Sequence, residues 1–454
     1  GQGGHTRNRQ APGGQAAMSG KRIKRRHAAP EWLKLDNAGK IYPATRSFGW
    51  MAVYRLSVTL DEPVDETLLN QALKTTVKRL PYFAYRLRRG LFWFYLEQQE
   101  GVPRVQPDAA NPCLPFSPGR DGHFMFRVRV HDCRVAVEIF HVLADGTGTM
   151  TFLLTLIAEY LRLKHGNRIP AFAPYILDCR DKPKPGEWED SFPVYARDAA
   201  RPRGEEAAYP LRGTPAERDY LQVTTGIMDS GRLAAAAKSR GATINTYLAA
   251  LILQALVGIA KEDKRKGRAK RPVKLSMPVN LRKYYKSSTL RNFSSYINVP
   301  VYADYGEYSL DDIITLVKHS MGYETAEQLI NARFSSNVHA EQSKAIRPVP
   351  LVVKSLILRM MYALTGERYF TSVLSNMGRI DLPEGMRGHV KRLDFIIGAG
   401  RSNPLSIGCV SVNGQTYLSF SRTIKEPEVE RRVLSALIRE GVPVVVESNR
   451  RINR

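Results

Sequence analysis

A histidine, an aspartate and a glycine lie close together in the stretch "FHVLADG", residues 140–146. His141 follows the strand-like run "RVAVEIF", and Asp145 comes four residues after it, directly before Gly146. A neutral imidazole can take up a proton near pH 7, so His141 is a candidate general base that would activate a hydroxyl or an amine. The end of a strand would expose this imidazole on a rigid support.

The neighbours of His141 suit a tight, ordered turn. Asp145 can bond the backbone or a nearby arginine, while Gly146 and Gly148 let the chain turn closely and let another group approach. The alternative is that His141, one of nine histidines, is satisfied locally and has no catalytic role. The position of the motif between a strand and a helix favours the functional interpretation.

The sequence lacks the signatures of several other reaction classes. No second His or Cys lies at ligand spacing from His141, so we expect no metal site. The absence of a G-x-S-x-G elbow argues against an α/β-hydrolase nucleophile, and no P-loop or G-x-G-x-x-G follows a strand. The four cysteines are widely scattered, which fits neither a zinc site nor a disulfide framework and indicates a reducing cytosol.

The elements that must position His141 are predicted from residue periodicity. Residues 124–141 predict a β-hairpin that turns at 132–133, and an apolar helix follows from about 148 to 163. Other segments with strand or helix patterns predict strands at 48–60, 91–98, 275–283 and 292–301, and helices at 65–80, 242–260, 310–333 and 350–364. Each half of the chain therefore mixes helices and strands, which predicts an α/β fold class.

The chain divides at a region rich in Pro, Gly and charge between about 166 and 222. Such a segment is too long for an ordinary connection within one lobe. We therefore predict a disordered basic tail (1–30), a first lobe (31–185), a crossover linker (186–222) and a second lobe (223–454).

The chain is strongly basic, with a formal net charge of +25 over 454 residues. Residues 1–30 hold seven Lys/Arg and no acid, and the remaining charge favours anionic partners such as a phosphate-bearing cofactor. The alternative is that these charges only keep the protein soluble. No run of 18 apolar residues and no signal-peptide pattern is present, so we expect no transmembrane segment and a cytoplasmic protein.

The stretch "FHVLADG" resembles the H-H-x-x-x-D-G signature of the chloramphenicol acetyltransferase-like superfamily, with Phe140 in place of the first histidine. This group includes BAHD acyltransferases, alcohol acetyltransferases and the condensation domains of peptide synthetases. The segments "LPYFAYRLRRGLFWFYLE", "MPVNLRKYY", "LRNFSSYINVPV", "VLSNMGRIDLP" and "VSVNGQTYLSFSR" are also similar to the family's strands. The resemblance covers residues 32–449 and is strongest to bacterial proteins labelled alcohol acetyltransferase. The BAHD motif D-F-G-W-G is absent, which argues against a plant-type enzyme.

The resemblance implies a fold of two similar α/β lobes, an α+β sandwich, with a central tunnel. The histidine lies midway along it, with the acyl donor arriving from one face and the acceptor from the other. His141 would then be the general base. Asp145 would be structural and point away from the histidine toward an arginine, for which Arg282 in "PVNLRK" is a candidate. Gly146 would keep the tunnel open.

The resemblance also suggests residues for binding. A serine on a strand of the second lobe would donate to the oxyanion, with Ser294 as the candidate and Ser295 as its rival; the alternative is that both hydroxyls satisfy an edge or a turn. Condensation domains carry an asparagine at the position of Asn298. The basic loop 261–274 is either a solvated loop or a clamp for coenzyme A phosphates, with candidates Lys266, Arg268, Lys270 and Arg271.

The sequence and the resemblance together predict a monomeric acyltransferase. It would move an acyl group, in the first instance acetyl, from acyl-coenzyme A to a small alcohol or amine, with no permanently bound cofactor. One alternative is a condensation-type enzyme that takes its donor from an acyl carrier protein. Another is a non-catalytic binding protein that keeps the fold. A nucleic-acid binder is less favoured, because no recognisable binding motif accompanies the basic residues.

Overall fold

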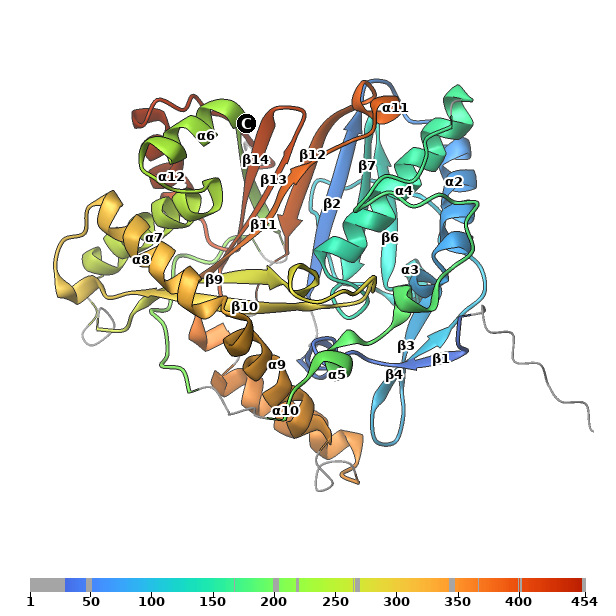
Figure 1. Cartoon of the computed structure of the whole chain (residues 1–454), viewed down its shortest axis with the longest axis horizontal. Helices are drawn as coiled ribbons and strands as arrows, with labels where there is room; N and C mark the ends of the chain where they lie inside the picture. The colour runs from blue at the N-terminus through green and yellow to red at the C-terminus, as the bar shows by residue number, and fades with distance from the viewer. Residues whose placement is uncertain are drawn as a thin grey trace, which may run out of the picture.

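The computed structural model describes residues 29–45, 51–166, 168–198, 204–217, 220–263, 265, 270–342, 348–365, 367–398, 400 and 402–450. Nearly all of the predicted basic tail lies outside these residues. The described residues form three sheets. The smallest is an antiparallel sheet of residues 32–34, 94–98 and 85–89, in that order. Figure 1 shows the two larger sheets side by side, with helices on their outer faces. This is the mixed α/β class predicted from the sequence.

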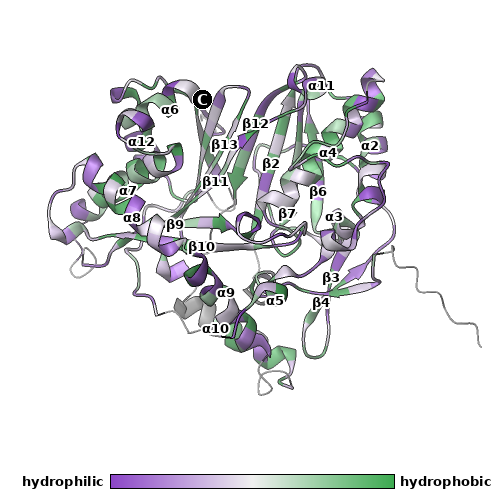
Figure 2. Cartoon of the chain, viewed as in Figure 1, coloured by the Kyte–Doolittle hydropathy of each residue, from purple (hydrophilic) through white to green (hydrophobic). Residues whose placement is uncertain are grey.

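The first sheet carries the histidine motif. Its strand order is β12-β2-β7-β6-β5. The strands span β2 (Val53–Leu60), β5 (Gln106–Pro107), β6 (Phe126–His131), β7 (Arg134–Phe140) and β12 (Val390–Ile397). The predicted hairpin is confirmed, because β6 and β7 pair antiparallel and their turn passes through Asp132 with a φ of 48°. The helices α2 (Glu66–Arg79) and α4 (Gly146–His165) cover this sheet, and Figure 2 shows apolar residues of α4 in green.

The second sheet has the order β10-β9-β11-β13-β14-β8-β15. Its strands are β8 (Gln222–Asp229), β9 (Val273–Asn280), β10 (Ser294–Val301), β11 (Ser372–Ile380), β13 (Leu405–Val412), β14 (Gln415–Arg422) and β15 (Val445–Ser448). The helices α6 (Ser230–Ser239), α7 (Ile244–Glu262), α8 (Leu310–Glu324) and α12 (Glu428–Arg439) pack beside it. By length and composition α7 alone among the described helices could cross a membrane, but 67% of its most apolar window is buried in the protein, as in the core helix of a folded lobe.

The two lobes are interlocked by β12. This strand follows β11 in the C-terminal half of the chain, yet it pairs antiparallel with β2, with Leu393 opposite Val58. If the chain is divided at 186–222, β12 falls in the second lobe by its position in the sequence. Its hydrogen bonds to β2 nevertheless make it part of the first sheet. The lobes therefore share an extended contact rather than a single connecting segment.

The segment predicted as a crossover linker contains short ordered elements. These are η2 (Pro185–Trp188) and α5 (Ser191–Tyr195). Phe192 of α5 is buried against Phe293 and Phe334, with ring centroids 5.3 and 5.8 Å away. Arg79 and Glu187 form a buried ion pair of 2.8 Å that holds η2 against α2.

Two predicted elements differ from those observed. The predicted helix 310–333 is two helices, α8 and α9 (Glu327–Gln342), because the α8 C-cap at Thr325 bonds back to Met321 and ends the first. The predicted strand 91–98 begins only at β4 (Phe94–Gln98), because Gly90 N donates to Trp93 O and closes a turn. The remaining elements are β1 (Trp32–Lys34), α1 (Ile41–Thr45), η1 (Pro81–Ala84), β3 (Tyr85–Arg89), α3 (Pro118–Asp121), η3 (Leu281–Lys283), η4 (Ala303–Tyr305), α10 (Leu351–Thr365), η5 (Glu367–Tyr369) and α11 (Glu384–Arg387).

Candidate active site

His141 lies at the end of β7, where the chain turns toward α4. Its backbone N donates to Ala52 O at 2.8 Å, which continues the ladder with β2 by one residue. His141 as a whole residue is half-buried. Tyr42 stacks on it with ring centroids 4.8 Å apart, and Tyr54 meets it edge-on at 5.0 Å. Tyr54 is itself fixed by a 2.9 Å bond from its hydroxyl to Ala144 O.

The second lobe holds one nitrogen of this ring. His141 Nδ1 lies 3.1 Å from Asn292 Oδ1. Asn292 Nδ2 donates to both carboxylate oxygens of Asp36, at 3.3 and 3.2 Å. Because the amide nitrogen faces a carboxylate, the amide oxygen must face the histidine, and an oxygen only accepts. Nδ1 therefore carries the proton in the neutral ring, and Nε2 carries the lone pair.

The surroundings of His141 keep its ring neutral. Burial lowers the pKa of His141 below its ordinary value of 6.5, and this outweighs a bond to its own backbone, the negative charge of Asp145 and the bond to Asn292, all of which raise the pKa. Burial raises the pKa of Asp36, against the opposing charge of Arg291. A neutral imidazole with a free Nε2 is the form that accepts a proton.

Asp145 connects the two lobes rather than supporting the imidazole. One carboxylate oxygen caps α4 by accepting from Gly148 N at 3.0 Å. The other accepts from Arg282 Nη1 at 2.7 Å and from Phe293 N at 2.9 Å. Arg282 also donates through Nη2 to the backbone oxygens of Thr289 and Arg291, at 2.8 and 2.7 Å. The ion pair expected between Asp145 and Arg282 is therefore confirmed.

Two glycines allow the second lobe to approach this turn. A Cβ on Gly148 would lie 2.0 Å from Leu290 O, so only glycine fits against that backbone. A Cβ on Gly146 would lie 2.9 Å from the Met377 sulfur, which belongs to the bulged part of β11. Gly146 thus lets β11 come close to the motif.

Ser294 lies on the sheet face that is turned toward the histidine motif. It sits directly opposite Asn280 in the β9–β10 pair, and opposed residues in an antiparallel pair share a face. Asn280 Nδ2 donates to Thr147 Oγ1 at 3.2 Å, at the start of α4. Ser295 is one residue on and therefore points to the other face. The register of the β9–β10 pair therefore places Ser294, and not Ser295, on the face toward the histidine motif.

Other predicted binding residues lie elsewhere. Lys266 and Arg268 fall outside the described residues. Lys270 and Arg271 are exposed and precede the start of β9. The strand itself is about 23 Å long, and its far end, Asn280, is the end that contacts the histidine motif. Asn298 is buried and donates to both carboxylate oxygens of Glu205 at 3.1 Å.

Three residues around His141 have no signal in the local sequence: Asn292, Asp36 and Tyr42. Asn292 is 151 positions from His141 in the chain, and Asp36 is 256 positions from Asn292. Asn292 reaches His141 only through the packing of the two lobes. Asp36 and Tyr42, in contrast, lie in the same lobe as His141 but about 100 positions before it in the chain. The single hint is that Asn292 is the first residue of the predicted strand 292–301, in which Ser294 was singled out.

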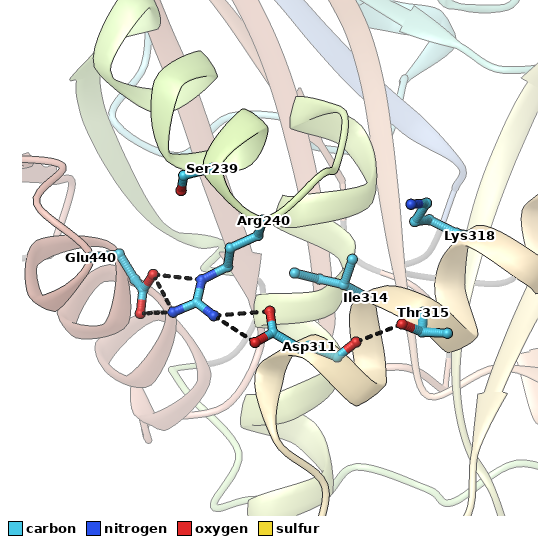
Figure 3. Close-up of a pocket in the computed structure, with 7 residues that line it drawn as sticks. All are labelled: Ser239, Arg240, Asp311, Ile314, Thr315, Lys318 and Glu440. Carbon is cyan, nitrogen blue, oxygen red and sulfur yellow. Dashed lines mark hydrogen bonds and ion pairs between the residues drawn. The ribbon is translucent and has the colours of Figure 1, made fainter.

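Two other groups of polar and charged side chains lie away from His141. A cavity of about 460 Å³ lies between α6, α8 and α12 (Figure 3) and is lined by Ser239, Arg240, Asp311, Ile314, Thr315, Lys318 and Glu440. Its arginine donates to Glu440 and Asp311 at 2.8 and 2.9 Å. The charges there satisfy one another, and no histidine lines it, so the cavity does not fit acyl-transfer chemistry.

Glu62, His165 and His389 offer ligand atoms within 4.8 Å of one another and could hold a metal ion by their chemistry. Lys164 Nζ, however, already lies 3.1 Å from the Glu62 carboxylate and competes with a cation. This group is at the C-terminal end of α4, about 28 Å along the helix from the histidine motif.

The structure is similar to solved proteins although no family profile matches the sequence and no curated protein matches it. One similar structure is the first condensation domain of the calcium-dependent antibiotic synthetase with a substrate analogue, at a TM-score of 0.60 and 16% identity, covering 91% of this chain and 99% of that one. Another is TRI101 of F. graminearum complexed with coenzyme A and T-2 mycotoxin. Its TM-score is 0.59 at 13% identity, and the match covers 91% of this chain and 99% of that one.

A third is polyketide synthase associated protein 5 from Mycobacterium tuberculosis, at a TM-score of 0.58 and 14% identity, covering 89% of this chain and 96% of that one. The chain has the chloramphenicol acetyltransferase-like fold. Within the chloramphenicol acetyltransferase-like fold, His141 stands where residues of both lobes meet, since Tyr54 belongs to the first sheet and Asn292 to the second lobe.

Proposed function

We propose that the protein transfers an acyl group from a thioester to an alcohol or amine, with His141 as the general base. The observation that carries this proposal is the hydrogen bond from His141 Nδ1 to Asn292, which leaves Nε2 as the only basic nitrogen of a neutral ring.

The reaction follows from this arrangement. The acceptor's O–H or N–H proton moves to Nε2 while its oxygen or nitrogen forms a bond to the thioester carbonyl carbon. The tetrahedral intermediate then collapses, the carbon–sulfur bond breaks, and the thiolate takes the proton back from Nε2. Holding both substrates beside one imidazole supplies much of the rate gain. Asp145 and Arg282 keep the two halves of the site in register.

Ser294 is proposed as the donor to the oxyanion. Its place opposite Asn280, on the face that contacts Thr147, supports this role over Ser295. A hydroxyl that donates where negative charge develops strengthens its bond in the transition state.

Acyl-coenzyme A is the proposed donor, with acetyl as the first acyl group to test. Two similar structures have coenzyme A or C8-CoA as partners, and the +25 charge suits a phosphate-bearing donor. We propose Lys270 and Arg271 as residues that bind its phosphates. Lys266 and Arg268, which lie outside the described residues, remain candidates because of their place in the basic loop. An acyl carrier protein is the alternative donor, since other similar structures are condensation domains. We further propose a monomer in the cytoplasm.

The test is acyl transfer to a pooled library of alcohols and amines, followed by mass spectrometry. Acetyl-coenzyme A and an acetylated carrier protein are compared at equal concentration. We expect His141→Ala to lower turnover about 10²–10⁴-fold. The matched control is His319→Ala, which removes an exposed histidine of α8 and should keep full turnover.

Equal turnover by His141→Ala and the unaltered protein would exclude His141 as the base. Binding of coenzyme A without transfer to any acceptor would instead favour a non-catalytic protein. A higher rate with the carrier protein would move the proposal to the condensation-type alternative.

A further inference from the structure

The helix α10 presents an apolar face to solvent. Val352, Val353, Leu356, Ile357 and Met360 are 46–63% exposed. Their spacing of i, i+1, i+4, i+5 and i+8 places all five within one arc of about 140° on a helix. A surface helix usually turns its apolar arc to the core, so α10 has the reverse arrangement.

The opposite side of α10 is anchored to the hairpin between β3 and β4. Leu351 N donates to Leu91 O at 2.8 Å, and Lys354 Nζ donates to Phe92 O at 3.2 Å. The Lys354 ammonium also lies 3.6 Å from the centre of the Trp93 ring. These contacts fix the helix with its apolar arc outward.

The hairpin tip extends the apolar area. Leu91 is 73% exposed and Phe92 is 42% exposed. Of the sixteen large apolar residues that are exposed in the described part of the chain, seven belong to this tip and α10. Figure 1 places both elements along the same lower edge of the molecule. We call these seven residues the α10 patch: Leu91, Phe92, Val352, Val353, Leu356, Ile357 and Met360. A clustered apolar patch on a soluble fold marks an interaction site.

The segments that carry the α10 patch are basic. The described residues 85–95 and 348–365 together contain five Lys/Arg and no Asp or Glu, and of these five Lys354 is buried. Arg89 at the end of β3 is exposed, and the single carboxylate of Glu97 is shared by Arg86 and Arg88. A two-fold contact between two copies would place these basic segments against each other, and like charges disfavour that arrangement.

We propose that the α10 patch docks on an anionic lipid surface. Apolar side chains on one helix face, with an aromatic residue beside them and the exposed Arg89 and Arg359 on the same two elements, are features of a segment that lies in the membrane interface. The apolar residues enter the boundary between headgroups and acyl chains, and the basic residues meet the phosphates. This inference does not depend on the proposed acyl transfer.

The test is co-sedimentation of the full chain with lipid vesicles. Vesicles of phosphatidylcholine with phosphatidylglycerol are compared with vesicles of phosphatidylcholine alone, at low and high salt. We expect binding to the anionic vesicles, weakened by salt. The double variant Leu356→Glu with Ile357→Glu should bind about tenfold less or weaker still, because it replaces two inserted side chains with charges.

The matched control is Leu316→Glu with Ile438→Glu, two exposed aliphatic residues of α8 and α12. It adds the same charge and should keep wild-type binding. Since all four side chains are exposed, circular dichroism should show equal thermal unfolding. Absence of binding to anionic vesicles, or equal binding by both double variants, would overturn the proposal. A dimer in analytical ultracentrifugation that only the α10 variant breaks, without vesicle binding, would also overturn it and assign the patch to self-association.

Discussion

At the scale of single residues, the choice of Asn292 as partner of His141 has a chemical consequence. A carboxylate at that position would place a charge next to the ring and raise its pKa. An amide fixes the same tautomer without a charge, and Asp36 orients the amide from the far side. His141 is thus held in one tautomer while burial still lowers its pKa, so it is a neutral base at pH 7.

Replacing Asn292 tests this role. In Asn292→Ala the imidazole loses the partner of Nδ1, and we expect kcat to fall about tenfold or more with little change in KM. The control is Asn331→Ala, which removes another buried amide that donates to Tyr195 O and Tyr285 Oη. Both variants should lose about 1–3 kcal/mol in urea unfolding, but only Asn292→Ala should lose turnover. If both variants lost the same fraction of kcat, Asn292 would have only a structural role.

At the scale of elements, the start of α4 sets the distance between the lobes. Asp145 caps this helix and Gly148 lies directly against the backbone of Leu290. The contact needs the missing side chain of glycine, not an unusual backbone angle, because Gly148 is not among the residues with positive φ. Any side chain here must push the two lobes apart.

Gly148→Ala should therefore destabilise the protein by about 1–3 kcal/mol, measured as a loss of free energy of unfolding in urea. Gly322→Ala is the matched control, since nothing lies within 4 Å of its Cβ position in α8. That variant should be more stable by about 0.5–1 kcal/mol, because alanine is the better helix residue. A Gly148→Ala protein as stable as the wild type would show that the contact with Leu290 yields at little cost.

At the scale of the whole molecule, the sequence predicts what is local and misses what depends on packing. The strand that ends at His141 and the helix that follows Asp145 are visible as apolar patterns, and resemblance added the partner Arg282. The exchange of β12 into the first sheet was not predictable from its own residues, because a strand pattern does not say which strand it will pair with. Asn292 was missed because it reaches His141 from the other lobe. Asp36 and Tyr42 were missed because only the tertiary fold brings them near His141.

The α10 patch was also missed, because its exposure depends on tertiary packing. The segment 350–364 was correctly predicted as a helix, and its apolar residues would ordinarily indicate a core face. The bonds of Leu351 and Lys354 to the β3–β4 hairpin show which side is covered. The periodicity identifies an apolar arc, and the tertiary structure decides whether that arc faces the core or the solvent.

The central claim is that His141 is neutral at pH 7 with its lone pair on Nε2. The most direct measurement is ¹⁵N NMR of histidine-labelled protein across a pH titration, with the His141 signals assigned by their absence from His141→Ala. We predict a protonated Nδ1, an unprotonated Nε2 and a pKa below 6.5. A proton on Nε2 at pH 7, or a pKa above 6.5, would contradict the account.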